Sequence, residues 1–102
     1  MARMVAIYKT PKDKATFERH YFGTHVPLAK QLPGLRKYEV SSGPIMAPAG
    51  GDCHFAAILH FDDMAAIRAA FASEIGQKCA ADRRNLAADG EVQILLFEDR
   101  TV

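Results

Sequence analysis

The sequence predicts an α+β fold whose elements follow the order strand, helix, strand, strand, helix, strand. Two observations support this prediction. Four short segments concentrate β-branched and aromatic residues, and two longer segments repeat apolar residues at intervals of three or four. A chain of 102 residues with 49% hydrophobic and 25% charged residues is typical of a globular domain with one core, so residues 1–102 are expected to form a single domain.

The first strand is expected over residues 3–9, RMVAIYK, because β-branched and aromatic residues gather there and Thr10-Pro11 follows. A helix is expected to start after Asp13. Large side chains then recur at intervals that place them on one helical face, and these are Phe17, Tyr21, His25, Leu28 and Leu32.

Gly23 and Pro27 interrupt this first helical segment. Glycine is a weak helix former, and proline has no N–H for the interior of a helix, although it is accepted in the first turn. We therefore expect two helical pieces, about 13–22 and 26–32, that meet at His25.

The middle of the chain predicts two strands joined by a loop. Pro33-Gly34 ends the helical segment, and LRKYEVSS at residues 35–42 has the composition of a second strand. Two prolines and three glycines mark residues 43–52 as a loop. The segment CHFAAILHF at residues 53–61 predicts a third strand that is apolar on both faces.

A second helical segment and a last strand complete the order. Asp62 or Asp63 is a suitable N-cap, and Ser73 with Glu74 restarts the helix, which is expected to end near Asp89-Gly90. Its apolar positions are Met64, Ile67, Phe71, Ile75, Cys79 and Leu86. The last strand is expected over residues 91–97, so that two split β-α-β units form the ferredoxin-like βαββαβ plan, a four-stranded antiparallel sheet with both helices on one face.

Both faces of the outer strands are apolar, although helices can cover only one of them. One face carries Val5, Ile7, Leu95 and Phe97, and the other carries Met4, Ala6, Tyr8, Val92, Ile94 and Leu96. Soluble monomers rarely expose an apolar patch much larger than about 300 to 600 Å². We therefore expect a homodimer in which two sheets pack face to face, leaving an interior for a small apolar ligand.

Charge and composition exclude several other classes of partner. Thirteen Lys and Arg against twelve Asp and Glu give a net charge of +1 without a basic tract, so nucleic acid is not an expected partner. Apolar runs fall far short of the roughly 20 residues of a membrane span, and no signal-peptide pattern is present, so we expect a cytoplasmic protein. Cys53 and Cys79 are expected to be reduced thiols: Cys79 as a small buried residue, and Cys53, beside a loop, as the more reactive one.

His25 is the strongest candidate for chemistry, because an imidazole has an ordinary pKa of about 6.5 and exchanges protons near neutral pH. Alternatively, it only caps or packs the expected kink. Tyr38 is placed to donate a hydrogen bond to a ligand carbonyl or enolate, or else to fill the space between sheet and helix. Tyr8 and Tyr21 are expected in the core or the wall of a pocket.

No metal or nucleotide cofactor is expected. His54 and His60 are six residues apart on one predicted strand, about 20 Å at roughly 3.3 Å per residue, so one ion cannot bind both. The chain has no H-x-x-x-H, C-x-x-C, G-x-S-x-G, Walker or G-x-G-x-x-G motif.

Several of these residues form a pattern that resembles the EthD family, named for ether degradation. The pattern comprises Tyr21, Thr24-His25-x-Pro27-Leu28, Leu32-Pro33-Gly34-Leu35 and Tyr38, and HFAAILHFDDMAAIRAAF at residues 54–71 is also similar. The resemblance implies a dimeric α+β barrel with a cleft between the sheet and its helices or at the barrel mouth. Similar barrels include cofactor-free monooxygenases of polyketide quinones and muconolactone isomerases, and in methylmuconolactone methylisomerases a histidine and a tyrosine correspond to His25 and Tyr38.

The resemblance and the residues together predict a binder of a small, apolar or oxygenated organic intermediate from the catabolism of ethers or other xenobiotics. His25 and Tyr38 are the expected catalytic residues of a cofactor-independent oxidoreductase or isomerase, with His25 as proton donor or acceptor. The expected substrate contacts are Tyr21, Tyr8, Leu28 and His54. The alternative is a non-catalytic accessory or carrier protein for a monooxygenase system.

Overall fold

The computed structural model describes residues 1–102 and contains the four-stranded antiparallel sheet that the sequence predicts. The strands are β1 (Ala2–Tyr8), β2 (Lys37–Val40), β3 (Phe55–Phe61) and β4 (Val92–Glu98). Their order in the sheet is β2-β3-β1-β4, so the first and third strands are central and the second and fourth are edges. This order is that of the ferredoxin-like fold.

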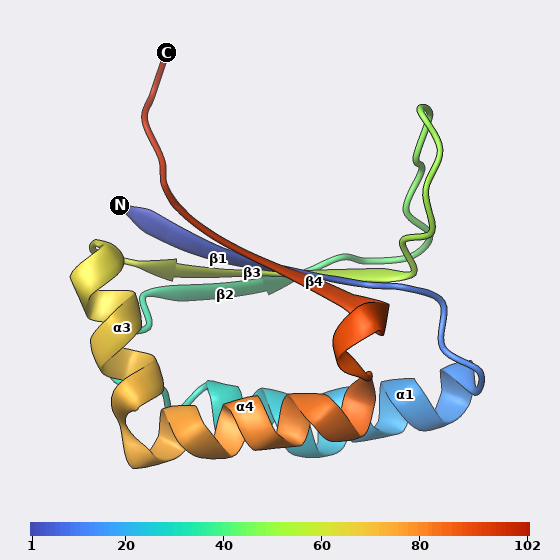
Figure 1. Cartoon of the computed structure of the whole chain (residues 1–102), viewed down its shortest axis with the longest axis horizontal. Helices are drawn as coiled ribbons and strands as arrows, with labels where there is room; N and C mark the ends of the chain where they lie inside the picture. Colours follow the sequence, from blue (N-terminus) through green and yellow to red (C-terminus); the bar gives the residue numbers. More distant parts are fainter.

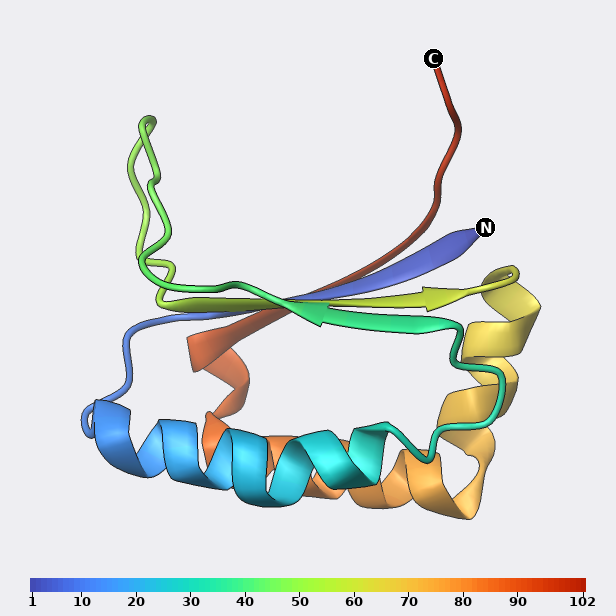
Figure 2. The same cartoon turned by 180° about the vertical axis from the view of Figure 1, so that it is seen from behind.

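All helices lie on one face of the sheet, as Figures 1 and 2 show from opposite sides. They are α1 (Lys14–His20), η1 (Tyr21–His25), α2 (Val26–Ala29), α3 (Met64–Ala72), α4 (Glu74–Leu86) and the short turn η2 (Asp89–Glu91). None of them is long and apolar enough to cross a membrane.

The predicted N-caps of the second helical segment are confirmed. The Asp63 carboxylate accepts a hydrogen bond from the Ala66 N–H at 2.7 Å, and the Ser73 hydroxyl accepts one from the Gly76 N–H at 3.1 Å. Ser73 has extended backbone, so it ends α3 and starts α4 in a different direction.

The prediction of two helical pieces that meet at His25 is correct only in part: a second α-helix does begin at Val26, with Pro27 in its first turn, but no break separates it from the first. Residues 14–29 are continuously helical, and residues 21–25 form a π-helical turn in which the Val26 N–H donates to the Tyr21 carbonyl. Pro27 explains the difference, because it has no N–H to offer the carbonyl of Gly23, four residues earlier. The chain accommodates this lost bond by one wider turn rather than by a break.

Element boundaries differ from the predicted ones by one to three residues. The second and third strands each begin two residues later than expected, at Lys37 and Phe55, and the first begins one residue earlier, at Ala2. The long helix ends at Leu86 instead of near residue 89, because Ala87 already has extended backbone. Such shifts are typical where the ends of elements depend on tertiary contacts.

The core lies between the sheet and the helices and is rich in aromatic rings. The rings of Tyr21 and Phe55 have centroids 4.5 Å apart, and those of Tyr8 and Phe17 are 5.3 Å apart, both edge to face. Tyr8, Tyr21, Phe61 and Ile67 are the largest side chains that are fully buried. This cluster anchors η1 against β1 and β3.

The opposite face of the sheet has no helix and carries the apolar positions that the alternation along the strands predicts, together with the polar side chains of Arg3, Lys37, Glu39, His60 and Gln93. Its apolar residues are Val5, Ile7, Ala56, Ile58, Leu95 and Phe97. Leu95 is 40% exposed and Phe97 is 43% exposed. We call this surface the open sheet face. On its β2 side, His60 and Glu39 form a hydrogen bond of 2.6 Å.

Candidate active site

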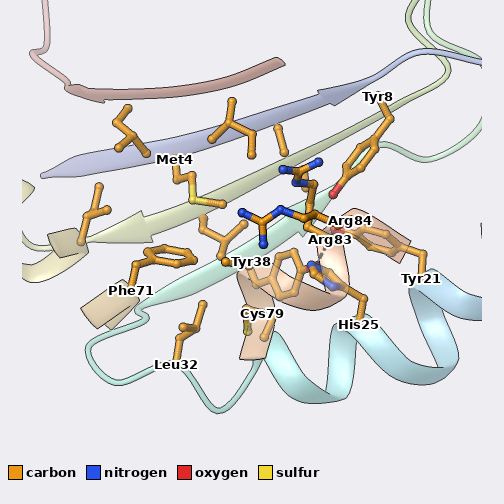
Figure 3. Close-up of a pocket in the computed structure, with 18 of the residues that line it drawn as sticks. Met4, Tyr8, Tyr21, His25, Leu32, Tyr38, Phe71, Cys79, Arg83 and Arg84 are labelled. Carbon is orange, nitrogen blue, oxygen red and sulfur yellow. Dashed lines mark hydrogen bonds between the residues drawn. The ribbon is translucent and has the colours of Figure 1, made fainter. Parts of the chain in front are cut away.

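A cavity of about 420 Å³ lies between the helix-covered face of the sheet and the helices (Figure 3). Fifteen of its nineteen lining residues are hydrophobic, so its interior suits an apolar molecule. The cavity lies within a single chain, and the expected interior between the two packed sheets of a dimer stays a prediction. The cavity matches the alternative expectation of a cleft between the sheet and its helices.

His25 lines this cavity at the end of the π-helical turn and is only 8% exposed. Its Nδ1 is 2.8 Å from Oδ2 of Asp82 on α4. Its Nε2 makes no hydrogen bond within the protein. Because every fully buried polar side-chain atom has a partner, Nε2 cannot be fully buried. Nε2 therefore keeps access to the cavity and is free to contact a ligand.

The Asp82 carboxylate joins two histidines. Oδ1 is 2.8 Å from Nε2 of His20, and Oδ2 is 2.8 Å from Nδ1 of His25. Asp82 was not among the residues predicted from the sequence, although its position on the helix offered a signal. It follows Cys79 by three residues and precedes Leu86 by four, so it is an acidic residue on the apolar face of a helix.

Burial and the carboxylate together set the protonation state of His25. Burial lowers the pKa of His25 below its ordinary value, although its hydrogen bond to Asp82 acts in the opposite direction. Burial also raises the pKa of Asp82, but the hydrogen bonds from His25 and His20 outweigh it, and the net pKa is lowered. An ionised carboxylate only accepts hydrogen bonds, so Nδ1 of neutral His25 carries the proton and Nε2 carries the lone pair of a base.

A pair of tyrosine hydroxyls forms a second polar group in the cavity wall. The hydroxyl oxygens of Tyr21 and Tyr38 are 2.5 Å apart, and the Tyr21 ring centroid is 5.2 Å from that of His25. Burial is the largest cause that raises the pKa of Tyr8, of Tyr21 and of Tyr38. All three therefore keep their protons at neutral pH and can act as hydrogen-bond donors.

Four of the six residues singled out from the sequence gather at this cavity: His25, Tyr38, Tyr21 and Tyr8. Leu28 packs against the core without lining the cavity. His54 precedes β3, with its ring edge-on to Phe17 at 5.8 Å, and it lines a separate, more polar cleft beside Lys14 and Glu18.

The two cysteines occupy different environments. Both are free thiols, and Cys79 lines the cavity, where burial raises its pKa to about 11. At that pKa the thiol remains protonated at neutral pH, so the structure agrees with a small buried side chain. Cys53 lies in the loop before β3 and is half-buried.

Three arginines that were not predicted as site residues also line the cavity: Arg68, Arg83 and Arg84. Their side chains come from α3 and α4, which meet only in the folded protein. No group of three or more histidine, cysteine, aspartate or glutamate side chains is arranged to hold a metal ion.

The dyad of His25 and Asp82 predicts two steps in the pH dependence of stability. A histidine whose pKa is lowered by folding binds fewer protons in the native state, so stability should fall as the pH drops below 6.5. Asp82 has a lowered pKa, so its contribution is present above 3.8 and should be lost as the pH falls further. Urea midpoints measured across this range should show both steps. His25→Gln should remove the upper step and also reduce the lower one, because it removes a hydrogen bond that lowers the pKa of Asp82, and an unchanged profile would contradict the assignment.

Comparison with known proteins agrees with this architecture. Residues 9–90 match the model of the EthD domain. An uncharacterised 11.0 kDa protein from the thcB-thcC intergenic region of Rhodococcus erythropolis is 34% identical over 102 residues, which is 100% of this chain and 98% of that protein.

Solved structures with the same fold include an EthD family protein from Bacillus halodurans, with a TM-score of 0.88 and 28% identity over 98% of this chain and 99% of that one. SnoaB, a cofactor-independent oxygenase from Streptomyces nogalater, has a TM-score of 0.69 and 20% identity over 99% of this chain and 94% of its own. A dimeric ferredoxin-like protein from Jannaschia has a TM-score of 0.71 and 15% identity over 96% and 98% of the two chains. The domain match over most of the chain and the full-length relative make this protein a member of the EthD family.

Proposed function

We propose that this protein binds a small, largely apolar, cyclic or oxygenated organic molecule in the cavity and that His25 exchanges a proton with it. The class of ligand follows from the apolar wall, and membership of the EthD family favours an intermediate from the breakdown of ethers or other xenobiotics. The observation that carries the proposal is the free Nε2 of His25, which Asp82 supports from behind and which opens on this cavity.

The residues present suit proton transfer at a carbon next to a carbonyl. Nε2 of His25 would accept the proton, and the Asp82 carboxylate would stabilise the imidazolium that forms. The phenol of Tyr38, with Tyr21 beside it, would donate a hydrogen bond to the enolate oxygen. His25 and Tyr38 are thus the proposed catalytic residues, Asp82 is a positioning residue, and Tyr8 and Tyr21 contact the ligand.

Two reaction types share this first step and need no organic cofactor. In an isomerisation, His25 returns the proton to a different carbon of the same molecule. In an oxidation, the enolate or phenolate gives electrons to dioxygen, which is then a co-substrate. The fold shared with SnoaB, itself described as a cofactor-independent oxygenase, supports the second type.

We also propose a homodimer formed by the open sheet faces. Leu95 and Phe97 stay 40% and 43% exposed in one chain, and a second copy related by a two-fold axis would cover both. The Jannaschia protein with the same fold is described as dimeric, which supports this arrangement. A cytoplasmic location is proposed because both cysteines are unpaired thiols.

Replacing His25 with glutamine tests the proposed chemistry. A panel of lactones, quinones and hydroquinones is first tested for turnover with the wild-type protein. With any substrate found, His25→Gln is expected to lower kcat by about 10² to 10⁴ while KM changes little, because it removes the base and leaves the apolar wall intact.

His54→Gln is the matched control, because it makes the same substitution outside the cavity and should leave kcat unchanged. Asp82→Asn should change the pH dependence of kcat, since it removes the group that supports the imidazolium. Undiminished kcat in His25→Gln would contradict the proposal. Tight binding without turnover of any compound would favour the alternative role as a carrier for a monooxygenase.

A further inference from the structure

We infer that the ligand of this cavity carries an anionic oxygen group, such as a carboxylate, which the arginines of α3 and α4 bind. The inference rests on the proposed function and specifies its class of ligand. Three lining residues are arginines, Arg68, Arg83 and Arg84, and no lining residue is an aspartate or glutamate. The cavity is therefore apolar over most of its wall, and three of its four other lining residues carry a positive charge.

Two of these arginines have no partner in the protein. Arg68 and Arg84 are exposed and make no hydrogen bond or ion pair. Three arginines of the chain are paired with carboxylates, Arg3 with Asp99, Arg36 with Asp62 and Arg83 with Asp89, whereas Arg19 bonds only the Thr16 hydroxyl and Arg100 has no partner. The two guanidinium groups at the cavity are thus free to bind an anion from solution.

Arg83 differs from the other two because the protein holds its guanidinium in place. Its Nη1 donates to the Ala87 carbonyl and its Nη2 to the Asp89 carboxylate, each at 2.8 Å. Its side chain is only 15% exposed. It is best regarded as a fixed part of the wall, whereas Arg84, its neighbour in sequence, can move to meet a ligand.

Helix electrostatics alone do not explain this arrangement. Basic residues are favoured in the last turn of a helix, and Arg83 and Arg84 occupy that position in α4. Arg68 lies in the middle of α3, where no such preference exists, and still lines the same cavity. Two helices therefore contribute positive charge to one site.

The charge of Asp82 does not neutralise these arginines. Asp82 does not line the cavity, and its two carboxylate oxygens are bound to His20 and His25. In Figure 3, Arg83 and Arg84 extend from α4 toward the sheet, while Met4, Leu32 and Phe71 occupy the far end of the cavity from His25. An amphiphilic acid would place its apolar body among the latter and its carboxylate on the arginines, which match carboxylates in shape as well as charge.

A matched pair of probes tests this inference by binding alone. Naphthoate and acetylnaphthalene share one ring system. In acetylnaphthalene, a methyl group replaces the charged oxygen of the naphthoate carboxylate. Calorimetric titration of the wild-type protein should give an affinity for naphthoate at least about tenfold higher, the effect of one charge-assisted contact. The double variant Arg68→Met and Arg84→Met should lose this preference and keep its affinity for acetylnaphthalene.

The control is the double variant Arg19→Met and Arg100→Met, which removes the same charge from exposed positions outside the cavity and should keep the preference for naphthoate. Equal affinities of the wild-type protein for the two probes would overturn the inference and leave the proposed function intact, since acetylnaphthalene still binds. A preference that survives in the Arg68 and Arg84 variant would also overturn it. Failure of both probes to bind would overturn the inference together with the proposed apolar ligand.

Discussion

Replacing Gly76 with alanine is expected to reduce the free energy of unfolding by about 2 to 3 kcal/mol. Gly76 lies in the first turn of α4, directly beside the end of α3. A Cβ added there would overlap the carbonyl oxygen of Ala70 and the backbone of Phe71, neither of which can rotate away like a side chain. The corner between the two helices would have to open, and α4 carries Asp82 and the cavity arginines.

Urea denaturation followed by circular dichroism measures this loss at a fixed protein concentration, and it suits a chain without tryptophan. Gly23→Ala is the matched control, because Gly23 is also helical and a Cβ there would meet nothing within 4 Å apart from its chain neighbours and the backbone of its own helix. That control is expected to be neutral or stabilising by about 0.5 to 1 kcal/mol. Equal stability of the two variants would show that close packing at residue 76 has no energetic role.

Replacing Leu95 with glutamate is expected to convert the proposed dimer into monomers. Leu95 lies on the open sheet face directly opposite Val5, so a carboxylate there has no cation directly opposite it, and the diagonal neighbour Arg3 is already bound to Asp99. A two-fold axis would bury the new charge twice, and burial of an unpaired charge costs several kcal/mol. The dissociation constant should rise by at least about a thousandfold, equivalent to about 4 kcal/mol.

Sedimentation velocity at micromolar concentration distinguishes the two states. Gln77→Glu adds the same charge to an exposed position on α4, on the helix side of the molecule, and should leave the dimer unchanged. A wild-type protein that sediments as a monomer would remove the proposal of a sheet-to-sheet dimer. So would a Leu95→Glu variant that remains dimeric.

Local patterns in the sequence were sufficient to predict most of the fold. Alternation along β1 separates Val5 and Ile7 from Ala6 and Tyr8, and the structure places the two pairs on opposite faces. Such patterns involve residues only a few positions apart, so they can be recognised in a single sequence without knowledge of long-range contacts. The π-helical turn was not predicted, because a proline after a glycine is compatible with either a break or a wider turn.

The candidate site could be predicted only in part, because its hydrogen bonds join distant segments. His25 and Asp82 are separated by 57 positions in the sequence, and Tyr21 and Tyr38 by 17. No local spacing encodes either pair. His54 is a residue that was expected beside the ligand but lies elsewhere. Its neighbours have the composition of a strand, but β3 starts at the next residue, Phe55, and the His54 ring packs against Phe17 of α1.

The π-helical turn also governs which changes in chain length this segment tolerates. An α-helix rotates by about 100° per residue, so side chains four positions apart drift steadily around its axis. The wider turn at residues 21–25 offsets that drift and keeps His25 and Ala29 on the buried side on which Phe17 lies. Insertion or deletion of a single residue here would therefore rotate one half of the helix relative to the other. Either Phe17, before the turn, or Ala29, after it, would then face water.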